Sequence, residues 1–153
     1  MEKETIEGFT IVGLAVRTTN ENGQAAQDIP ALWNKFMSEN ILAQISDKAD
    51  QQIYCMYTEY EDDFRKPYTT ILGCKVANNP ITVPEGLVAK FVPTNNYTKI
   101  VATANLQEGA VYKAWTDIWN SNLNRAYQAD FEVYGSAAQD PNNASVDIFI
   151  SVN

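Results

Sequence analysis

The order of strand-like and helix-like segments along this chain is the feature that most constrains its fold. Runs of β-branched and apolar residues over 9–18, 53–60 and 68–76 predict strands. Between the first two, apolar side chains recur at helical spacing after Asp28, which is expected to cap a helix. Gly13, in the middle of the first strand, indicates a bulge or a close approach of two backbones. The first half of the chain is therefore expected to run strand, helix, strand, strand.

The same order begins again after residues 77–86, a segment rich in asparagine and proline that is the best candidate for an internal junction. The second half offers strand-like runs, then apolar residues at helical spacing, then two more strands, over 87–92, 97–103, 111–123, 130–134 and 146–152. One amphipathic helix and a short antiparallel patch cannot bury both faces alone, whereas two such halves packed together share a core.

We therefore predict one α+β domain over 1–153, built from two pseudo-repeated β-α-β-β units at 1–79 and 80–153. The units are expected to form a curved antiparallel sheet with two main helices and a central ligand cleft. Coincidence is the alternative to duplication, because many α+β proteins alternate strands with helices.

Composition excludes several classes of function. The chain has 153 residues and a net charge of −8, which disfavours binding to a nucleic-acid backbone. It has no histidine, so Ser-His and Cys-His catalytic pairs and histidine-ligated zinc are ruled out. No apolar run is long enough to cross a bilayer, and the N-terminus is polar and acidic, which predicts a cytoplasmic protein without a membrane partner. Cys55 and Cys74 lie in apolar runs and are expected to be buried, reduced thiols.

The sequence predicts neither a cofactor nor a metal. The acidic residues Glu59, Glu61, Asp62 and Asp63 lack the ligand spacing and the turn glycine of a calcium loop, and are expected to form a solvated loop. The sequence also contains no phosphate-binding glycine loop and no Cys-x-x-Cys pair.

Glu132 is the most informative single residue. In the strand over 130–134, alternation places Phe131 and Val133 on one face and Glu132 with Tyr134 on the other. Two interpretations stay open. One is a solvated outer face, and the other is a carboxylate at the floor of an aromatic pocket, where it needs a partner such as an organic cation. Aromatic rings around that cation would add about 0.5–2 kcal/mol each.

Aromatic side chains are numerous enough to line such a pocket. The chain has seventeen of them, and eight are tyrosine, whose flat apolar body and polar tip suit a ligand-binding wall. Trp33 and Trp115 fit the apolar faces of the two helices and are expected in the core, whereas Trp119 lies one residue off that face and can reach the cleft. Periodicity does not decide which strand face meets the cleft. The candidate ligand-binding residues are Glu132, Tyr57, Tyr54, Trp119, Tyr134 and Phe149.

Several segments together resemble a known family. They are Tyr57-Thr-Glu-Tyr-Glu and Tyr68-Thr-Thr-Ile-Leu-Gly73-Cys-Lys-Val76 in the first half, and Trp115 to Trp119, Phe131-Glu132-Val133-Tyr134 and Asp147-Ile-Phe-Ile-Ser-Val in the second. With the doubled order of elements, they are similar to the gyrase-inhibitor-like (GyrI-like, AraC-type) effector-binding domains, and most of all to the integron-cassette effector-binding proteins. The resemblance covers nearly the whole chain.

The resemblance implies two β-α-β-β repeats around a cleft that binds lipophilic, often cationic, small molecules against a buried glutamate. The family's glutamate falls on Glu132, its strand aromatic on Tyr54 or Tyr57, and the tryptophan late in its second helix on Trp119. Many members are the sensor halves of multidrug-responsive transcription regulators. We expect no helix-turn-helix in this protein, and therefore no direct binding of nucleic acid. Ser151 stands where the family often has proline, which affects only local strand shape.

Three functions are open at this point. The leading hypothesis is a stand-alone, non-enzymatic protein that binds an amphipathic, cationic and aromatic small molecule, with a separate regulator protein as a further partner. The second is a hydrolase of a reactive cyclopropane-bearing compound, which the resemblance implies for some stand-alone relatives, with Glu132 as base or charge stabiliser. The third is a regulator of a protein partner, as gyrase inhibition is in some relatives.

Overall fold

The structure is a computed structural model, and it describes residues 3–63, 65–77, 83–104, 110–135 and 144–153. The strands within these residues are β1 (Lys3–Ile6), β2 (Phe9–Thr18), β3 (Ile53–Thr58), β4 (Tyr68–Val76), β5 (Val88–Val92), β6 (Asn95–Ala104), β7 (Ala129–Tyr134) and β8 (Ala144–Val152). The helices are the short turn η1 (Glu21–Gly23), α1 (Ala25–Ser38), α2 (Ile41–Gln44) and α3 (Ala110–Trp119). None of these helices is long and apolar enough to span a bilayer.

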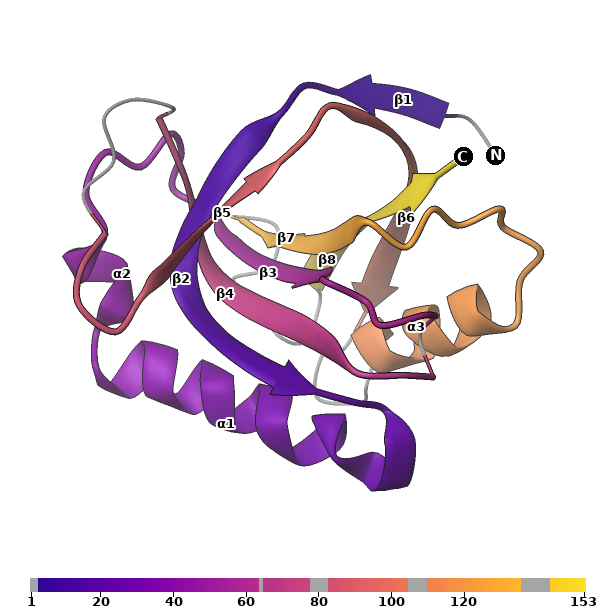
Figure 1. Cartoon of the computed structure of the whole chain (residues 1–153), viewed down its shortest axis with the longest axis horizontal. Helices are drawn as coiled ribbons and strands as arrows, with labels where there is room; N and C mark the ends of the chain where they lie inside the picture. Colours follow the sequence, from indigo (N-terminus) through magenta and orange to yellow (C-terminus); the bar gives the residue numbers. More distant parts are fainter. Residues whose placement is uncertain (1–2, 64, 78–82, 105–109, 136–143) are drawn as a thin grey trace.

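The strands form one antiparallel sheet in the order β1-β6-β8-β7-β3-β4-β2-β5. This order is symmetric about the central pair β7 and β3, because β8 and β6 continue on one side and β4 and β2 on the other. Figure 1 shows that the sheet curls strongly and that α1 and α3 lie on the same side of it. The predicted α+β fold with a curved antiparallel sheet is confirmed. The strand order supports the predicted duplication, which itself stays a prediction.

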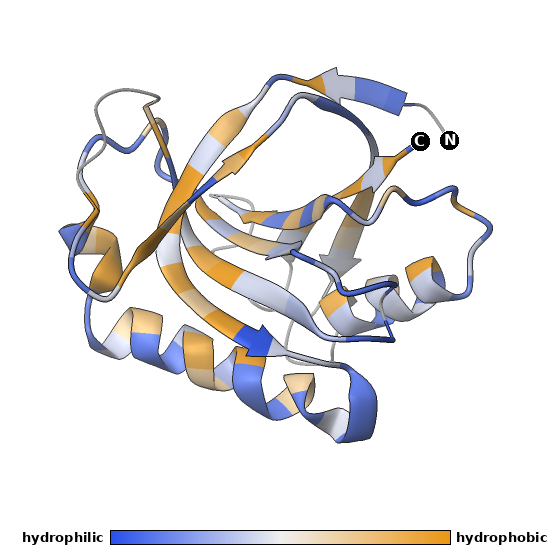
Figure 2. Ribbon diagram, viewed as in Figure 1, coloured by the Kyte–Doolittle hydropathy of each residue, from blue (hydrophilic) through white to orange (hydrophobic). Residues whose placement is uncertain are grey.

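Both faces of the sheet are apolar, which explains why its strands read as continuous apolar runs. On one face Val12, Leu14 and Leu72 pack against Leu32 and Phe36 of α1. A second cluster on this face joins Trp115 and Ile118 of α3 to the buried isoleucines and valines of β8. The opposite face carries its own cluster inside the curl, made of Phe9, Ile11, Tyr54, Met56, Phe131 and their neighbours. Figure 2 shows hydrophobic residues concentrated on the strands and in bands along α1 and α3.

Gly13 and Gly73 face each other on β2 and β4. A Cβ atom on Gly13 would lie 2.1 Å from the Leu72 carbonyl oxygen, and one on Gly73 would lie 2.0 Å from the Val12 carbonyl oxygen. Real Cβ atoms essentially never approach so closely, so only glycine fits at either position. The two strands stay in register here, and of the two expectations for Gly13 the close approach of backbones is the one observed.

Strands β2 and β4 have the predicted bounds, whereas the start of α1 was predicted wrongly. The helix begins at Ala25, so Asp28 lies in its first turn and is not its cap. The Asp28 carboxylate instead accepts hydrogen bonds from the Thr18 hydroxyl at 2.8 Å and the Gln24 amide at 3.1 Å. It thereby ties the helix to the end of β2, which places α1 over the sheet.

Other boundaries differ for local reasons. Strand β3 ends at Thr58, because Glu59 has a φ of 53° and cannot continue an extended strand. Strand β1 was not predicted, since Lys3-Glu-Thr-Ile carries too little apolar character to signal a strand. It forms by pairing with β6 at the edge of the sheet. Helix α3 stops at Trp119, short of the predicted Leu123.

Two predicted connectors are described only in part. Residues 78–82 of the junction at 77–86 lie outside the described residues. In the acidic segment, Glu59 forms a salt bridge with Lys90 and Asp63 with Arg65. Among the described residues no group of acidic or cysteine side chains is placed to hold a metal ion. Both cysteines are free and buried, as predicted.

Candidate ligand-binding site

A cavity of about 390 Å³ lies between α1, α3 and the sheet. One wall comes from α1 and the turn before it, the other from α3, and the floor from β3, β4 and β7. The aromatic and charged side chains of its lining are Trp33, Tyr57, Tyr60, Tyr68, Tyr112, Trp115, Trp119, Arg125, Glu132 and Tyr134. Among the described residues that line it, eight are aromatic and only Arg125 and Glu132 carry a charge, so this part of the cavity is an aromatic chamber with two ionic groups.

Glu132 lies at the floor of this cavity and is 2% exposed. Its Oε2 atom accepts hydrogen bonds from the Tyr57 hydroxyl at 2.8 Å and from Trp115 Nε1 at 2.6 Å. Its Oε1 atom accepts a third from the Tyr134 hydroxyl at 2.5 Å. All three donors are neutral, and Glu132 takes part in no salt bridge with any described residue. The carboxylate is therefore held in place without a counter-charge.

Opposing effects act on the ionisation of Glu132. Burial raises its pKa, because a charged carboxylate loses its hydration there. The hydrogen bonds from Tyr134, Tyr57 and Trp115 lower the pKa, since they favour the charged form, and burial outweighs them. Burial also raises the pKa of the Tyr57 and Tyr134 hydroxyls well above their usual value. Both phenols therefore stay neutral and keep their protons to donate.

The register between β3 and β7 explains how these groups meet. Cys55 lies opposite Glu132, and Tyr57 lies two residues further along the same face of β3. The Cys55 thiol donates to the Tyr57 hydroxyl oxygen at 3.4 Å. Cys55 therefore contacts the tyrosine that donates to Glu132. Trp115, the third donor's residue on this face, comes from helix α3, which packs against the sheet. Burial raises the pKa of Cys55 well above its usual value, which makes this thiol unreactive.

The aromatic side chains contact one another around the cavity. Trp33 of α1 meets Tyr134 edge to face at 4.8 Å between ring centroids, and Tyr57 meets Trp115 at 5.3 Å. Near α3 the rings of Tyr112 and Trp119 are 6.0 Å apart, and Tyr112 is 67% exposed. The aromatic lining thus extends from the buried floor to the surface.

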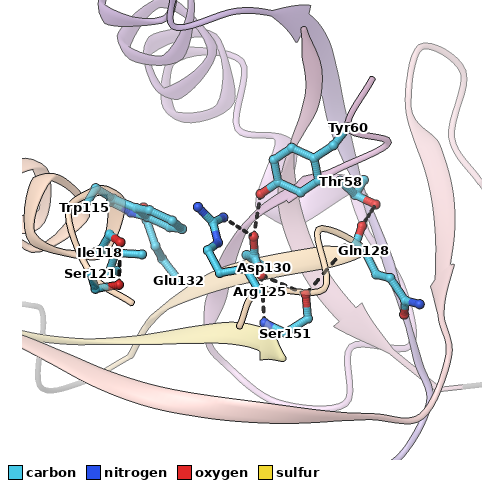
Figure 3. Close-up of polar contacts among 10 residues, drawn as sticks. All are labelled: Thr58, Tyr60, Trp115, Ile118, Ser121, Arg125, Gln128, Asp130, Glu132 and Ser151. Atoms are coloured by element: carbon cyan, nitrogen blue, oxygen red, sulfur yellow. Dashed lines mark hydrogen bonds and ion pairs between the residues drawn. The ribbon is translucent and has the colours of Figure 1, made fainter. Parts of the chain in front are cut away.

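Arg125, the other charged residue of the cavity, forms a buried ion pair with Asp130. Its Nη2 atom donates to Asp130 Oδ2 at 2.7 Å, and Asp130 is fully buried. Asp130 also accepts hydrogen bonds from the Tyr60 hydroxyl at 2.6 Å and from the backbone and hydroxyl of Ser151 at 2.8 and 3.0 Å. The Arg125 guanidinium lies 4.3 Å from the Tyr127 ring centroid. Figure 3 shows this network next to Glu132 and Trp115.

Four of the six predicted ligand-binding residues line the cavity, namely Glu132, Tyr57, Tyr134 and Trp119. Tyr54 and Phe149 do not lie there. Tyr54 precedes Cys55, so alternation turns it to the opposite face, where it packs with Phe9 and its hydroxyl donates to Asp50 at 2.7 Å. Phe149 stacks on Phe131 at 4.9 Å on that same face.

Sequence reasoning missed several lining residues. Trp33 and Trp115 fit the helical apolar faces and were assigned to the core, but both also border the cavity. Tyr68 begins β4, and nothing in its position along the chain signals the cavity. Arg125 lies between α3 and β7, and no local pattern signals its burial, which depends on its ion pair with Asp130.

Comparisons with known proteins place the chain in a family. Residues 4–152 match the family model described as integron-associated effector binding protein. The Vibrio cholerae integron cassette protein VCH_CASS2 is 30% identical, with a TM-score of 0.73 over 99% of this chain and 95% of that chain. The transcriptional-regulator-like protein YobU of Bacillus subtilis is 27% identical over 144 residues, which cover 92% of this chain and 89% of YobU.

A structure of SAV2435 shows the same fold at lower identity. It was determined bound to tetraphenylphosphonium, and it matches with 15% identity and a TM-score of 0.78 over 99% of this chain and 93% of that one. The family match, however, extends over almost the whole sequence. The chain belongs to the integron-associated effector-binding proteins.

Proposed function

We propose that the cavity binds a lipophilic, aromatic small molecule that carries one positive charge, and that Glu132 is its counter-ion. The observation that carries this proposal is a carboxylate that is 2% exposed, fixed by three neutral donors and without a cationic partner among the described residues. A buried carboxylate of this kind costs several kcal/mol to desolvate. An organic cation supplies the missing charge and stays in an apolar environment.

The balance of buried charges supports a single positive charge on the ligand. Among the described residues, two carboxylates, Asp130 and Glu132, and one guanidinium, Arg125, are buried in or beside the cavity. Arg125 pairs with Asp130 at 2.7 Å, so only Glu132 is left uncompensated. A monocation neutralises the site, whereas a dication would leave a buried positive charge unpaired.

The aromatic lining and the charge of the whole chain favour the same class of ligand. The faces of Trp and Tyr rings attract cations by about 0.5–2 kcal/mol each, most strongly where water is excluded. The net charge of −8 raises the local concentration of cations near the protein. The structure of similar fold with bound tetraphenylphosphonium, a lipophilic monocation, adds support for this ligand class.

The proposal is tested by titrating the protein with the fluorescent monocation tetramethylrosamine. Glu132→Gln keeps the size of the side chain and removes its charge, so the affinity is expected to fall at least about tenfold, or about 1.4 kcal/mol. Glu39→Gln makes the same chemical change at an exposed residue that directly follows α1. This control is expected to leave the affinity unchanged. Equal affinities of the wild type and Glu132→Gln would refute the assigned role.

A further inference from the structure

Arg125 has hydrogen-bond donors that no described residue of the protein accepts. The residue is 8% exposed and lines the cavity. One amino group, Nη2, is bonded to Asp130, but Nε and Nη1 are buried and have no hydrogen-bond partner among the described residues. Figure 3 shows the guanidinium between Asp130 and Trp115, with one amino group directed to Asp130 and the other away from it.

Neighbouring aromatic rings do not replace those hydrogen bonds. The guanidinium carbon lies 4.3 Å from the Tyr127 ring centroid and 5.8 Å from that of Trp115. Such contacts stabilise the charge of the cation, but they provide no lone pair for an N–H group. A buried donor that lacks an acceptor is costly, and native proteins rarely leave one without a functional reason.

We propose that Arg125 forms a second subsite of the cavity, which receives a hydrogen-bond acceptor of the ligand. This inference rests on the proposed function, since it concerns the same ligand. Trp115 connects the two subsites, because its Nε1 atom donates to Glu132 while its ring lies beside the Arg125 guanidinium. A ligand whose positive charge lies near Glu132 therefore presents its other side near Arg125. Because Nε and Nη1 have almost no exposed surface in this structure, the guanidinium has to turn toward the cavity for the ligand's acceptor to reach them.

The acceptor on the ligand is a neutral group, such as an ester, amide or ether oxygen. Asp130 already neutralises the charge of Arg125, so only the N–H groups are left to be satisfied. A ligand carboxylate would cancel the ligand's own positive charge and leave the negative charge of Glu132 uncompensated. The structure thus assigns this cavity to an aromatic monocation with a neutral acceptor, and disfavours zwitterions.

Two dyes that differ by one group test this inference on the intact wild-type chain. Tetramethylrosamine and tetramethylrhodamine methyl ester share a cationic xanthene core and a phenyl ring, and only the second carries an ester. Fluorescence titration is expected to give about tenfold tighter binding of the ester dye, because a charged donor gains a partner. The free-acid form of the same rhodamine, a zwitterion, is expected to bind more weakly than the ester.

A charge-balanced double variant identifies the residue responsible. Arg125→Met combined with Asp130→Asn removes one positive and one negative charge, so the net charge of the site is unchanged. The ratio of the two affinities is the measurement: the preference for the ester dye over tetramethylrosamine is expected to fall from about tenfold in the wild type to about onefold in this variant. Circular dichroism checks that the variant folds, and if it does not, the dye comparison on the wild type decides alone.

The possible failures are distinguishable. If both dyes bind the wild type equally, or if the double variant still prefers the ester, the acceptor subsite is overturned while the cation site stands. If neither dye binds, or if Glu132→Gln leaves the affinity for tetramethylrosamine unchanged, the proposed function fails and the subsite fails with it.

Discussion

Replacing Glu132 by glutamine is expected to stabilise the protein in the absence of ligand. The carboxylate now accepts two hydrogen bonds at Oε2, from Tyr57 and Trp115, and one at Oε1, from Tyr134. A glutamine with its oxygen in the place of Oε2 can accept the first two. Its amide nitrogen, in the place of Oε1, can donate to the Tyr134 hydroxyl oxygen. The number of hydrogen bonds is preserved, and the change removes one buried negative charge.

The direction of the change follows from the balance of effects on the pKa of Glu132. Burial raises the pKa of Glu132 more than its three hydrogen bonds lower it, so the ionised form is less favourable in the folded chain than in the unfolded chain. Near neutral pH the substitution should therefore raise the free energy of unfolding. For a single substitution the usual size of such a change is about 1 kcal/mol, or about 2–4 °C in Tm for a chain of this size. The variant would thus gain stability while losing affinity for cations.

The pH dependence gives the sign of the effect. When a carboxyl pKa is higher in the folded state, the folded chain keeps a proton that the unfolded chain has released. The stability contributed by this proton is complete below the ordinary glutamate pKa of about 4.3 and is lost as the pH rises through the raised value. The advantage of Glu132→Gln over the wild type is therefore expected to be small in acid and to grow toward neutral pH.

Urea unfolding followed by tryptophan fluorescence at a series of pH values measures this difference. Glu39→Gln is the matched control, because the same chemical change at an exposed position should leave stability unchanged at every pH. A wild type that is more stable than Glu132→Gln, by a margin that grows with pH, would refute the reasoning. That result would mean that the three charge-assisted hydrogen bonds outweigh the cost of burial.

Three further predictions concern neighbouring parts of the structure. Trp115→Phe removes one donor to Glu132 and thereby raises the carboxyl pKa, so titration should show weaker cation binding near neutral pH and recovery at higher pH; a loss independent of pH would argue against it. Gly73→Ala places a Cβ 2.0 Å from a carbonyl oxygen of the facing strand, so urea unfolding should show a loss of about 3 kcal/mol or more in stability. Unchanged stability would mean that the two strands can move apart without cost. Asp130→Asn leaves Arg125 without its counter-ion and should destabilise by about 3–5 kcal/mol, of which Arg125→Met in the same chain restores part; no restoration would contradict a pairwise effect.

Local patterns in the sequence were sufficient to predict most strands. The β-branched runs over 9–18 and 68–76 became β2 and β4 without change. Their apolar residues alternate between two buried faces, so the pattern predicts a strand but not which face meets a ligand. Strand β1 lacks any local signal and exists only through its pairing with β6, which is a tertiary effect.

The candidate site could be predicted only where local alternation was enough. Placing Glu132 and Tyr134 on one face of a strand needs only the period of two residues, and both line the cavity. Whether Tyr54 or Tyr57 faces the cavity depends on which face of β3 is turned toward α1. The alternation of residues along a strand does not give that information. Arg125 could not be recognised, because its burial depends on Asp130 and on rings brought in from other segments.

The charges in the cavity differ in how narrowly they define a ligand. Cation–π attraction and the field of a buried carboxylate depend weakly on direction, so Glu132 and its aromatic surroundings select positive charge and flatness more than shape. Hydrogen bonds are directional, and the N–H groups of Arg125 that have no partner among the described residues can recognise a particular group at a particular place. Glu132→Gln should therefore weaken the binding of all cationic ligands together. Arg125→Met combined with Asp130→Asn should instead change which cationic ligands bind most tightly.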